Sequence, residues 1–138
     1  MRVVKSNDQF EVRTEDAVIH FQEGLIGLAE CKNFVLLDSP NLAPFRLLKC
    51  VDSPRIGFLV LQATMVITNF YEYVPVREWE SIGIGPTKEL AFVIIMIGSP
   101  PEASTGNFQA PLLVNDQKMI GKQLILTDAT LSRRHPLG

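Results

Sequence analysis

Four side chains of the types that most often hold metals or act as nucleophiles and bases stand far apart in this sequence: His20, Cys31, Cys50 and His135. Their spacing contains none of the CxxC, HxxxH or HExxH patterns that place neighbouring ligands on one turn or one helix face. A metal site would need all four to converge from distant positions. We therefore expect no metal centre.

Nucleophilic catalysis needs a serine or cysteine within hydrogen-bond reach of a base and of a group that orients the base. The chain has no G-x-S-x-G motif. A pairing of Cys50 with His20 stays open, but nothing in the sequence favours it, and His20 is more simply a strand residue with local hydrogen-bond partners. The sequence predicts a protein that is not an enzyme and uses no cofactor.

Phosphate binding is the remaining chemistry that the residue types suggest. Residues 83–88 contain two glycines and a lysine, but not in the order of a P-loop, and Pro86 removes one backbone donor. A barrel that binds cyclic dinucleotides needs two arginines four positions apart, whose guanidinium groups fork onto phosphates. No two arginines have that spacing; they are at 2, 13, 46, 55, 77, 133 and 134. This counts against a small-molecule (cyclic-dinucleotide-type) binding barrel, the alternative function.

The elements that position these residues are short strands rich in β-branched and aromatic residues. One stretch, 75–82, predicts a short helix, with Pro75 near its first turn and Gly83 as its stop. About eight to ten strands with close turns indicate a mainly all-β fold, a small antiparallel β-barrel-like domain with one short helix. We expect a single domain over 1–138, with a hairpin turn at 115–116. The candidate strands are 9–12, 17–21, 33–38, 45–51, 56–61, 90–97, 109–114 and 118–127.

Two strand patterns predict which faces are buried. Val18 and His20 should share one face of their strand, with Ile19 and Phe21 on the other, because side chains alternate along a strand. Residues 90–97 are apolar throughout, so both faces of that strand should be buried. At eight residues, with three β-branched members, it is expected to be a central strand rather than a helix.

Charge is unevenly distributed along the chain. Residues 1–117 carry nine Lys/Arg and fourteen Asp/Glu, a net of −5, whereas residues 118–138 carry four Lys/Arg against one Asp, a net of +3. The overall charge of −2 argues against direct binding of nucleic acid, which needs a clustered basic surface. We expect an acidic body with a basic C-terminal part.

The compartment is predicted from apolar runs and thiols. The N-terminal residues lack the apolar stretch of a secretory signal, and the longest uninterrupted apolar run has eight residues, far below the ~18–20 needed to span a bilayer. We expect a cytoplasmic protein that does not interact with membranes. Its two cysteines should be reduced thiols.

Several segments resemble, in order and spacing, the flagellar assembly factor FliW family. Val18-Ile-His-Phe21-Gln-Glu-Gly24-Leu-Ile-Gly27 is similar to the family pattern I-x-F-x-x-G-[IL]-P-G-[FL], except that Ile26 replaces the proline. In the C-terminal half, the segments that carry the resemblance are Thr105-Gly-Asn107-Phe-Gln-Ala110-Pro111, Gly121-Lys-Gln-Leu-Ile-Leu126 and His135-Pro-Leu137. There Gly106 replaces the usual alanine, which should loosen the segment.

The resemblance implies a β-barrel-like protein without enzymatic activity that binds two partners. One partner is flagellin, bound before export. The other is the translational regulator CsrA, whose repression of flagellin mRNA is relieved by the binding. CsrA must carry a basic surface to bind RNA, so the acidic body formed by residues 1–117 would complement it.

Many residues at the bend 23–27 and at 105–108 match the family pattern, so we expect partner contacts there. An equally good interpretation is that these residues match because the fold requires them, since glycines make tight bends and the Asn107 side chain can form a hydrogen bond with the backbone of a turn. Aromatic side chains are also needed in a core of this size. The candidate partner-binding residues are Glu23, Gly24, Leu25, Gly27, Phe45, Thr105, Asn107 and Phe108.

Overall fold

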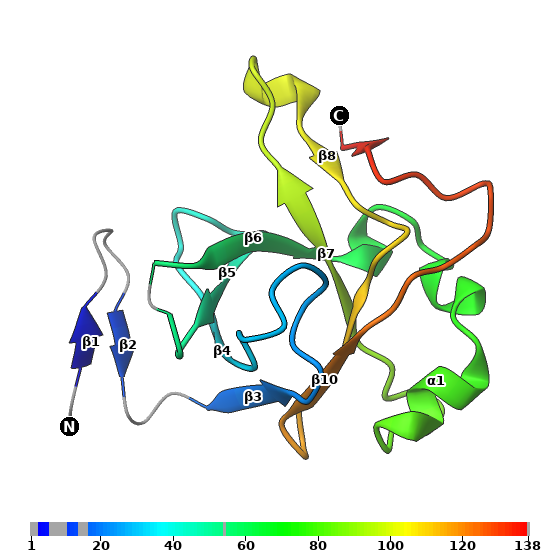
Figure 1. The fold of residues 1–138 in the computed structure, drawn as a ribbon. Helices are drawn as coiled ribbons and strands as arrows, with labels where there is room; N and C mark the ends of the chain where they lie inside the picture. The colour runs from blue at the N-terminus through cyan, green and yellow to red at the C-terminus, as the bar shows by residue number, and fades with distance from the viewer. Residues whose placement is uncertain (1–2, 6–10, 14–16, 54, 138) are drawn as a thin grey trace.

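The computed structural model describes residues 3–5, 11–13, 17–53 and 55–137, and most of its regular structure is β-strand (Figure 1). Among these residues, the single α-helix is α1 (Val76–Ser81), and the short 3₁₀ helices are η1 (Ala63–Met65), η2 (Phe70–Tyr73) and η3 (Pro101–Ala103). The strands are β1 (Val3–Lys5), β2 (Glu11–Arg13), β3 (Val18–Phe21), β4 (Asn33–Leu37), β5 (Arg46–Cys50), β6 (Gly57–Gln62), β7 (Ala91–Met96), β8 (Thr105–Gly106), β9 (Leu112–Asn115), β10 (Ile120–Gln123) and β11 (His135–Pro136).

Seven strands close into a barrel in the order β7-β6-β5-β4-β3-β10-β9, and β9 pairs back with β7. Every pair is antiparallel except β3 with β10, where Ile120 lies opposite His20 and Gly121 opposite Phe21. The predicted antiparallel β-barrel-like fold is confirmed, and the structure adds one parallel pair to it. Strands that alternate in direction around a ring of seven must close with one parallel pair, because seven is odd.

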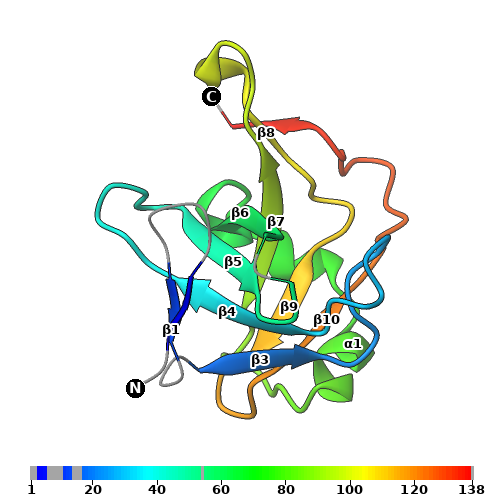
Figure 2. The ribbon, with the colours of Figure 1, turned by 60° about the vertical axis from the view of Figure 1, so that its left-hand side comes forward.

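Beyond the barrel, the end of β7 continues into a three-stranded antiparallel ribbon that the sequence did not predict. Ile95 and Met96 of β7 pair with Gly106 and Thr105 of β8, and β8 pairs in turn with β11. The ribbon projects from the barrel in both views (Figures 1 and 2). We call these three paired strands, with the β7–β8 connection, the lobe. At the other end of the chain, β1 and β2 form a separate antiparallel pair.

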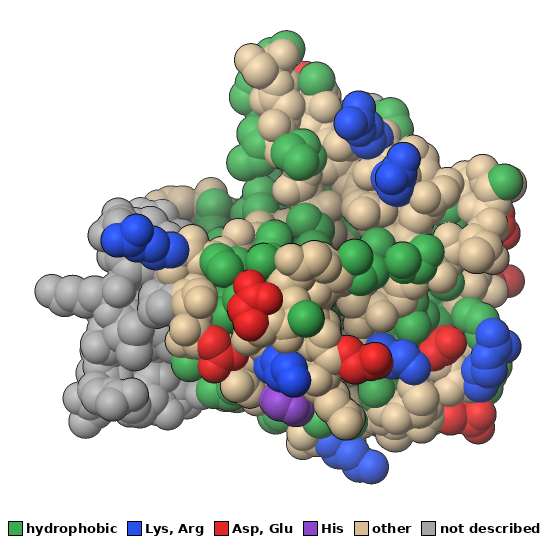
Figure 3. Space-filling model, in the orientation of Figure 1, with side chains coloured by type: hydrophobic (Ala, Val, Ile, Leu, Met, Phe, Trp, Pro, Cys, Tyr) green, Lys and Arg blue, Asp and Glu red, His purple; other side chains and the backbone are tan. Residues whose placement is uncertain are grey.

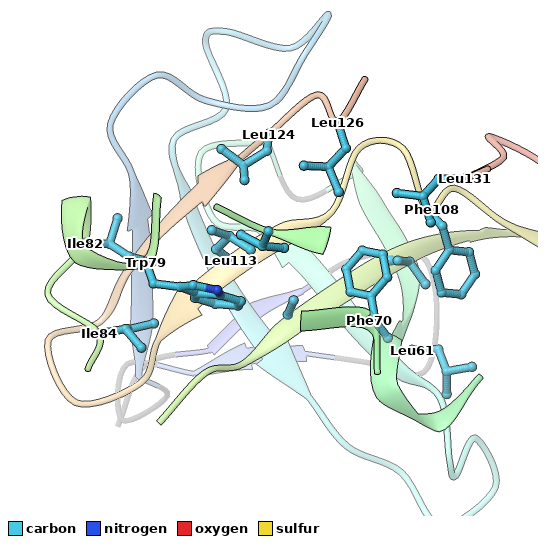
Figure 4. Packing of buried hydrophobic residues seen from close by; sticks show 14 of the residues in the cluster. Leu61, Phe70, Trp79, Ile82, Ile84, Phe108, Leu113, Leu124, Leu126 and Leu131 are labelled. Atoms are coloured by element: carbon cyan, nitrogen blue, oxygen red, sulfur yellow. The ribbon is translucent and has the colours of Figure 1, made fainter. Parts of the chain in front are cut away.

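Buried apolar side chains form two clusters on opposite sides of the barrel wall. The first fills the barrel and consists of Ile19, Phe21, Leu25, Cys31, Phe34, Leu48, Cys50, Val60, Phe92, Leu112 and Val114. The second, which we call the outer cluster, lies between the wall, α1, the 3₁₀ segments and the C-terminal strand region. Its members include Leu61, Phe70, Trp79, Ile82, Ile84, Phe108, Leu113, Leu124, Leu126 and Leu131 (Figure 4). Apolar residues on both faces of β7 are explained by this arrangement, since the strand separates the two clusters.

The predicted burial patterns are largely confirmed. In β3, Ile19 and Phe21 are buried while Val18 and His20 are exposed. In β7, residues on both faces are buried through Val93, Ile94 is half-buried and Ile95 is buried, but the prediction was wrong for the end of the run, where Met96 is 72% and Ile97 64% exposed. These two residues have left the barrel and lie on the lobe.

The predicted bounds of the helix and of the β9–β10 turn can be compared with the structure. The predicted helix at 75–82 is confirmed as α1, which ends at Ser81 and is followed two residues later by Gly83, whose φ is +77°. The predicted hairpin turn at 115–116 was too short, because the turn spans 116–119 and Asn115 belongs to β9. The Asn115 carboxamide accepts bonds from the Lys118 and Gln117 amides and donates to the Ile82 carbonyl at 2.7 Å, which joins this turn to the end of α1.

Two further strand predictions were too long. The strand predicted at 109–114 is β9 (Leu112–Asn115), and the strand predicted at 118–127 is β10 (Ile120–Gln123). Part of the predicted strand 9–12, at 9–10, lies outside the described residues. Within the described part of the chain, no helix is long and apolar enough to cross a membrane.

Candidate functional site

The two-glycine bend at 23–27 closes one end of the barrel. Gly24 and Gly27 have φ values of +69° and +82°, a backbone conformation that L side chains rarely adopt. A Cβ on Gly24 would lie 2.7 Å from the Ala29 carbonyl oxygen, so this position also lacks room for a side chain. Leu25 points into the barrel cluster and is buried. The bend is therefore shaped by folding requirements, with Glu23 and Ile26 left on the surface.

The departure from the family pattern at Ile26 has a structural counterpart. The Ile26 amide donates to the Gln123 Oε1 at 2.7 Å, and the Gln123 Nε2 donates to the Ala110 carbonyl. A proline at position 26 would have no N–H to donate. Gln123 thus ties the bend to β10 in this chain, while the Ile26 side chain remains 58% exposed.

A first hollow, of about 440 Å³, lies between the bend, the end of α1 and β10. Its charged lining residues are Glu23 and Lys122. The Lys122 ammonium already binds the Glu78 carboxylate at 2.7 Å and lies near the Ser81 hydroxyl. The Lys122 ammonium is therefore already paired, and Glu23 is the unpaired charged side chain among those that line the hollow.

A second hollow, of about 1270 Å³, lies beside the lobe and contains the other predicted segment. Thr105 and Asn107 are half-buried in its wall. The Asn107 Oδ1 accepts the Gln109 amide at 3.1 Å, which is the turn bond that the folding interpretation expected. Arg133 and Arg134 also line this hollow; the sequence shows their charge but gives no signal that they meet the lobe.

The eight candidate partner-binding residues therefore do not form one surface. Glu23, Gly24, Leu25 and Gly27 border the first hollow, and Thr105 and Asn107 border the second. Phe108 is fully buried in the outer cluster, and Phe45 is half-buried against the same cluster. Partner binding by these residues stays a prediction.

The exposed side chains near the bend are mostly acidic. Glu23, Glu30 and Asp52 are exposed, and the exposed Lys32 lies among them. On the face shown in Figure 3, Asp and Glu side chains are interspersed with Lys and Arg side chains over the barrel and the α1 region, and further Lys or Arg side chains stand higher, beside the lobe. The surface around the bend is therefore mixed in charge, with more carboxylates than cations among the residues named here.

The Asp52 carboxylate holds the start of β4, directly after the bend. It accepts the backbone amides of Lys32 and Asn33 at 3.1 and 3.0 Å, and the Asn33 side-chain amide at 3.2 Å. Burial alone would raise the pKa of Asp52, but these hydrogen bonds outweigh it and keep the pKa below the ordinary value of 3.8. The carboxylate form is therefore favoured by folding.

This lowered pKa predicts an acid-dependent contribution to stability. A depressed folded-state pKa stabilises the fold above the unfolded pKa, and the stabilisation disappears as pH falls through the folded value. We expect the difference in unfolding free energy between wild type and Asp52→Ala to be constant near neutral pH and to shrink below the ordinary pKa of 3.8. Urea titrations across this range measure it. Asp52→Asn, which keeps an acceptor but cannot titrate, is the control; a difference that persists undiminished in acid would contradict the assignment.

The two cysteines are free and fully buried in the barrel cluster. Burial, and then the contact with Cys50, raises the pKa of the Cys31 thiol to about 11. A thiol with this pKa stays protonated near neutral pH and is a poor nucleophile. Among the residues described, no three His, Cys, Asp or Glu side chains come together as a metal-binding group.

Taken together, these observations define a small mixed β-barrel with open hollows beside the bend and beside the lobe. A sequence model of the FliW protein family matches residues 4–137. The chain belongs to the FliW family of flagellar assembly factors, which are non-enzymatic, so the predicted family and the predicted lack of enzymatic activity are both confirmed.

Relatives from two bacteria match over most of their length. The chain is 30% identical to the flagellar assembly factor FliW of Geobacillus kaustophilus, covering 96% of this chain and 92% of that protein. It is 33% identical to that of Bdellovibrio bacteriovorus, covering 94% and 74%. A crystal structure of a flagellar assembly factor FliW superposes with a TM-score of 0.86 at 28% identity, covering 99% of this chain and 96% of the other.

Proposed function

We propose that this protein binds flagellin and the translational regulator CsrA in the cytoplasm, and that its binding of CsrA relieves repression of flagellin mRNA translation. The observation that carries the proposal is the match to flagellar assembly factors over nearly the whole chain. Flagellin subunits must be kept from polymerising before export, and a regulator that binds RNA must be reached through its basic surface. Both tasks need exposed protein-binding surfaces rather than a catalytic site.

Calorimetry separates this function from the alternative, a barrel that binds cyclic dinucleotides. We expect heat of binding with monomeric flagellin and with CsrA, and none with the nucleotide. The commitment of Lys122 to Glu78 at 2.7 Å supports this expectation for the first hollow, because that cation is not free to take a phosphate. Binding of the nucleotide alone would replace the proposed function by the alternative.

The acidic surface around the bend predicts how CsrA associates. Replacing the exposed Glu23 by lysine should lower the association rate several-fold at low salt, and the difference should fade as ionic strength rises, because exposed charges are screened beyond about 10 Å at 0.1 M salt. Stopped-flow or surface-binding kinetics measure the rates. Glu102→Lys changes the net charge equally at an exposed site on the lobe and is the matched control. Equal rates for the two variants would exclude the bend as the CsrA surface.

A further inference from the structure

The two thiols of the chain meet where the bend joins the barrel wall. Cys31 lies between the bend and β4, and Cys50 is the last residue of β5. Both side chains are completely buried, and they form a side-chain hydrogen bond with each other. The backbone holds the two segments together, because Phe34 pairs with Cys50 and the Val51 amide donates to the Asn33 carbonyl at 2.7 Å. The fold therefore places two sulfur atoms from distant parts of the sequence in contact.

The bend and the residue after it cover this pair. The Leu28 amide donates to the Leu25 carbonyl at 2.8 Å, and both leucine side chains pack in or against the barrel cluster that contains the thiols. The Cys31 amide in turn donates to the Leu28 carbonyl at 3.1 Å. Lifting the bend would consequently remove its leucines from this end of the cluster and uncover Cys31.

Gln123 provides the hydrogen bond that ties the bend to another strand. The bonds of Leu25 and Leu28 stay within the bend region, whereas the Ile26 amide reaches the Gln123 Oε1 on β10 at 2.7 Å. A hollow of about 440 Å³ separates the bend from the end of α1, so the helix does not press the bend onto the barrel. Segments that are held by few contacts open locally more often than the core does.

We propose that Cys31 and Cys50 form a reversible disulfide when the bend opens in the presence of a peroxide, and that this bond fixes the end of the bend to β5. The device goes beyond the proposed function and does not depend on it. In a reducing compartment the pair stays a dithiol until an oxidant appears, which is the behaviour of redox-sensing disulfides.

The reaction balances with hydrogen peroxide as the oxidant. The thiolate of one cysteine attacks a peroxide oxygen and becomes a sulfenic acid, and the hydroxide that leaves takes up a proton to give water. The second thiolate attacks the sulfenic sulfur, so the S–S bond forms, the S–O bond breaks and a second water leaves. In the closed barrel the Cys31 thiol is protonated and out of reach of water, so the first step has to wait for the bend to open.

Mass spectrometry of the wild-type protein tests whether the bond forms. After exposure to hydrogen peroxide at neutral pH, followed by unfolding and alkylation, we expect a monomer that has lost both thiols and two hydrogen atoms, and that dithiothreitol restores. Cys31→Ala and Cys50→Ala should each keep one thiol that forms no internal disulfide. Two intact thiols under conditions that oxidise the urea-unfolded chain, or disulfide-linked dimers in place of the monomer, would overturn the proposal.

The role of the bend is tested by the rate of this oxidation in the folded protein. Gln123→Ala should oxidise about fivefold faster than wild type, the factor expected when one ordinary hydrogen bond no longer opposes opening. Gln123→Glu keeps an acceptor for the Ile26 amide and should oxidise at nearly the wild-type rate. Gln109→Ala also loses a side-chain bond to a backbone carbonyl, that of Leu131 at 2.8 Å, but lies away from the bend and is the matched control. Equal rates for Gln123→Ala and Gln109→Ala would show that the bend does not control access.

Hydrogen exchange tests whether the disulfide fixes the bend. The Cys31 amide should exchange about tenfold more slowly in the oxidised protein, because the cross-link opposes local opening. The Ser104 amide, which donates to the Pro101 carbonyl at 3.0 Å on the lobe, should exchange equally in both forms. Unchanged or faster exchange at Cys31 would mean that the bond does not hold the bend, and the proposal would fail. None of these measurements uses a partner protein, so their outcome is separate from that of the proposed function.

Discussion

Replacing Gly121 by alanine is expected to destabilise the protein by about 3 kcal/mol, at the upper end of the cost of overpacking a core. A Cβ at this position would lie 2.4 Å from the Cζ of Phe21 and 2.7 Å from both Cε atoms. Phe21 cannot turn away cheaply, because it is 1% exposed and packs edge-on against the Phe34 ring at 5.5 Å. The substitution therefore has to displace a full ring in the barrel interior or separate β10 from β3.

Urea denaturation followed by circular dichroism measures this effect. Gly85→Ala is the matched control and should cost little, because no atom lies within 4 Å of the added Cβ and its φ is not positive. A smaller side chain at position 21 should relieve the clash, so Gly121→Ala should cost clearly less in a Phe21→Leu background than in wild type. Equal costs in the two backgrounds would show that the ring is not the cause.

Phe108→Ala should cost about 4 kcal/mol, the typical loss when a buried phenylalanine is truncated. The Phe108 ring is fully buried and contacts the rings of Phe70 and His135 at centroid distances of 5.6 and 4.9 Å. Its amide donates to the Ser132 carbonyl at 3.0 Å, so the residue also ties the segment before β11 to the outer cluster. The cavity would therefore loosen the attachment of the C-terminal strand to the lobe.

Thermal and urea unfolding report this loss, which should lower the melting temperature by roughly 12 °C for a domain of this size. Phe45→Ala serves for comparison: Phe45 is only half-buried at the edge of the same cluster, so its truncation should cost about half as much. Similar costs for the two variants would contradict the central position given to Phe108. Phe108→Leu, which keeps most of the volume, should restore much of the stability.

Phe108 also shows which part of the candidate site could be predicted from the sequence. Its place in a dense family motif marked it as important but could not distinguish a partner contact from a core residue. Gly106 is similar: a Cβ there would lie 2.9 Å from the Phe108 Cε1, so the glycine that replaces the family's alanine is matched to the local packing of this ring. Both assignments depend on what surrounds the residue, which the motif does not contain.

The sequence by itself determined the features that depend on near neighbours along the chain. Alternation of side chains placed Ile19 and Phe21 on one face of their strand, which the structure shows to be the buried one, and Pro75 and Gly83 bounded the only α-helix of the described chain. The apolar run at 90–97 was correctly expected to be a central strand. These features follow from periodicity, proline geometry and glycine φ, all of which act over a few residues.

Only the tertiary structure decided how distant segments meet. The parallel closure of β3 on β10 follows from the number of strands in the ring. The bond from the Ile26 amide to Gln123 joins residues 97 positions apart. Arg133, in the turn before β11, and Met96, at the end of β7, line one hollow. Such contacts depend on the summed packing of the whole chain rather than on any local pattern, which is why the sequence predicted a basic C-terminal part and an apolar strand but not the surface that they form together.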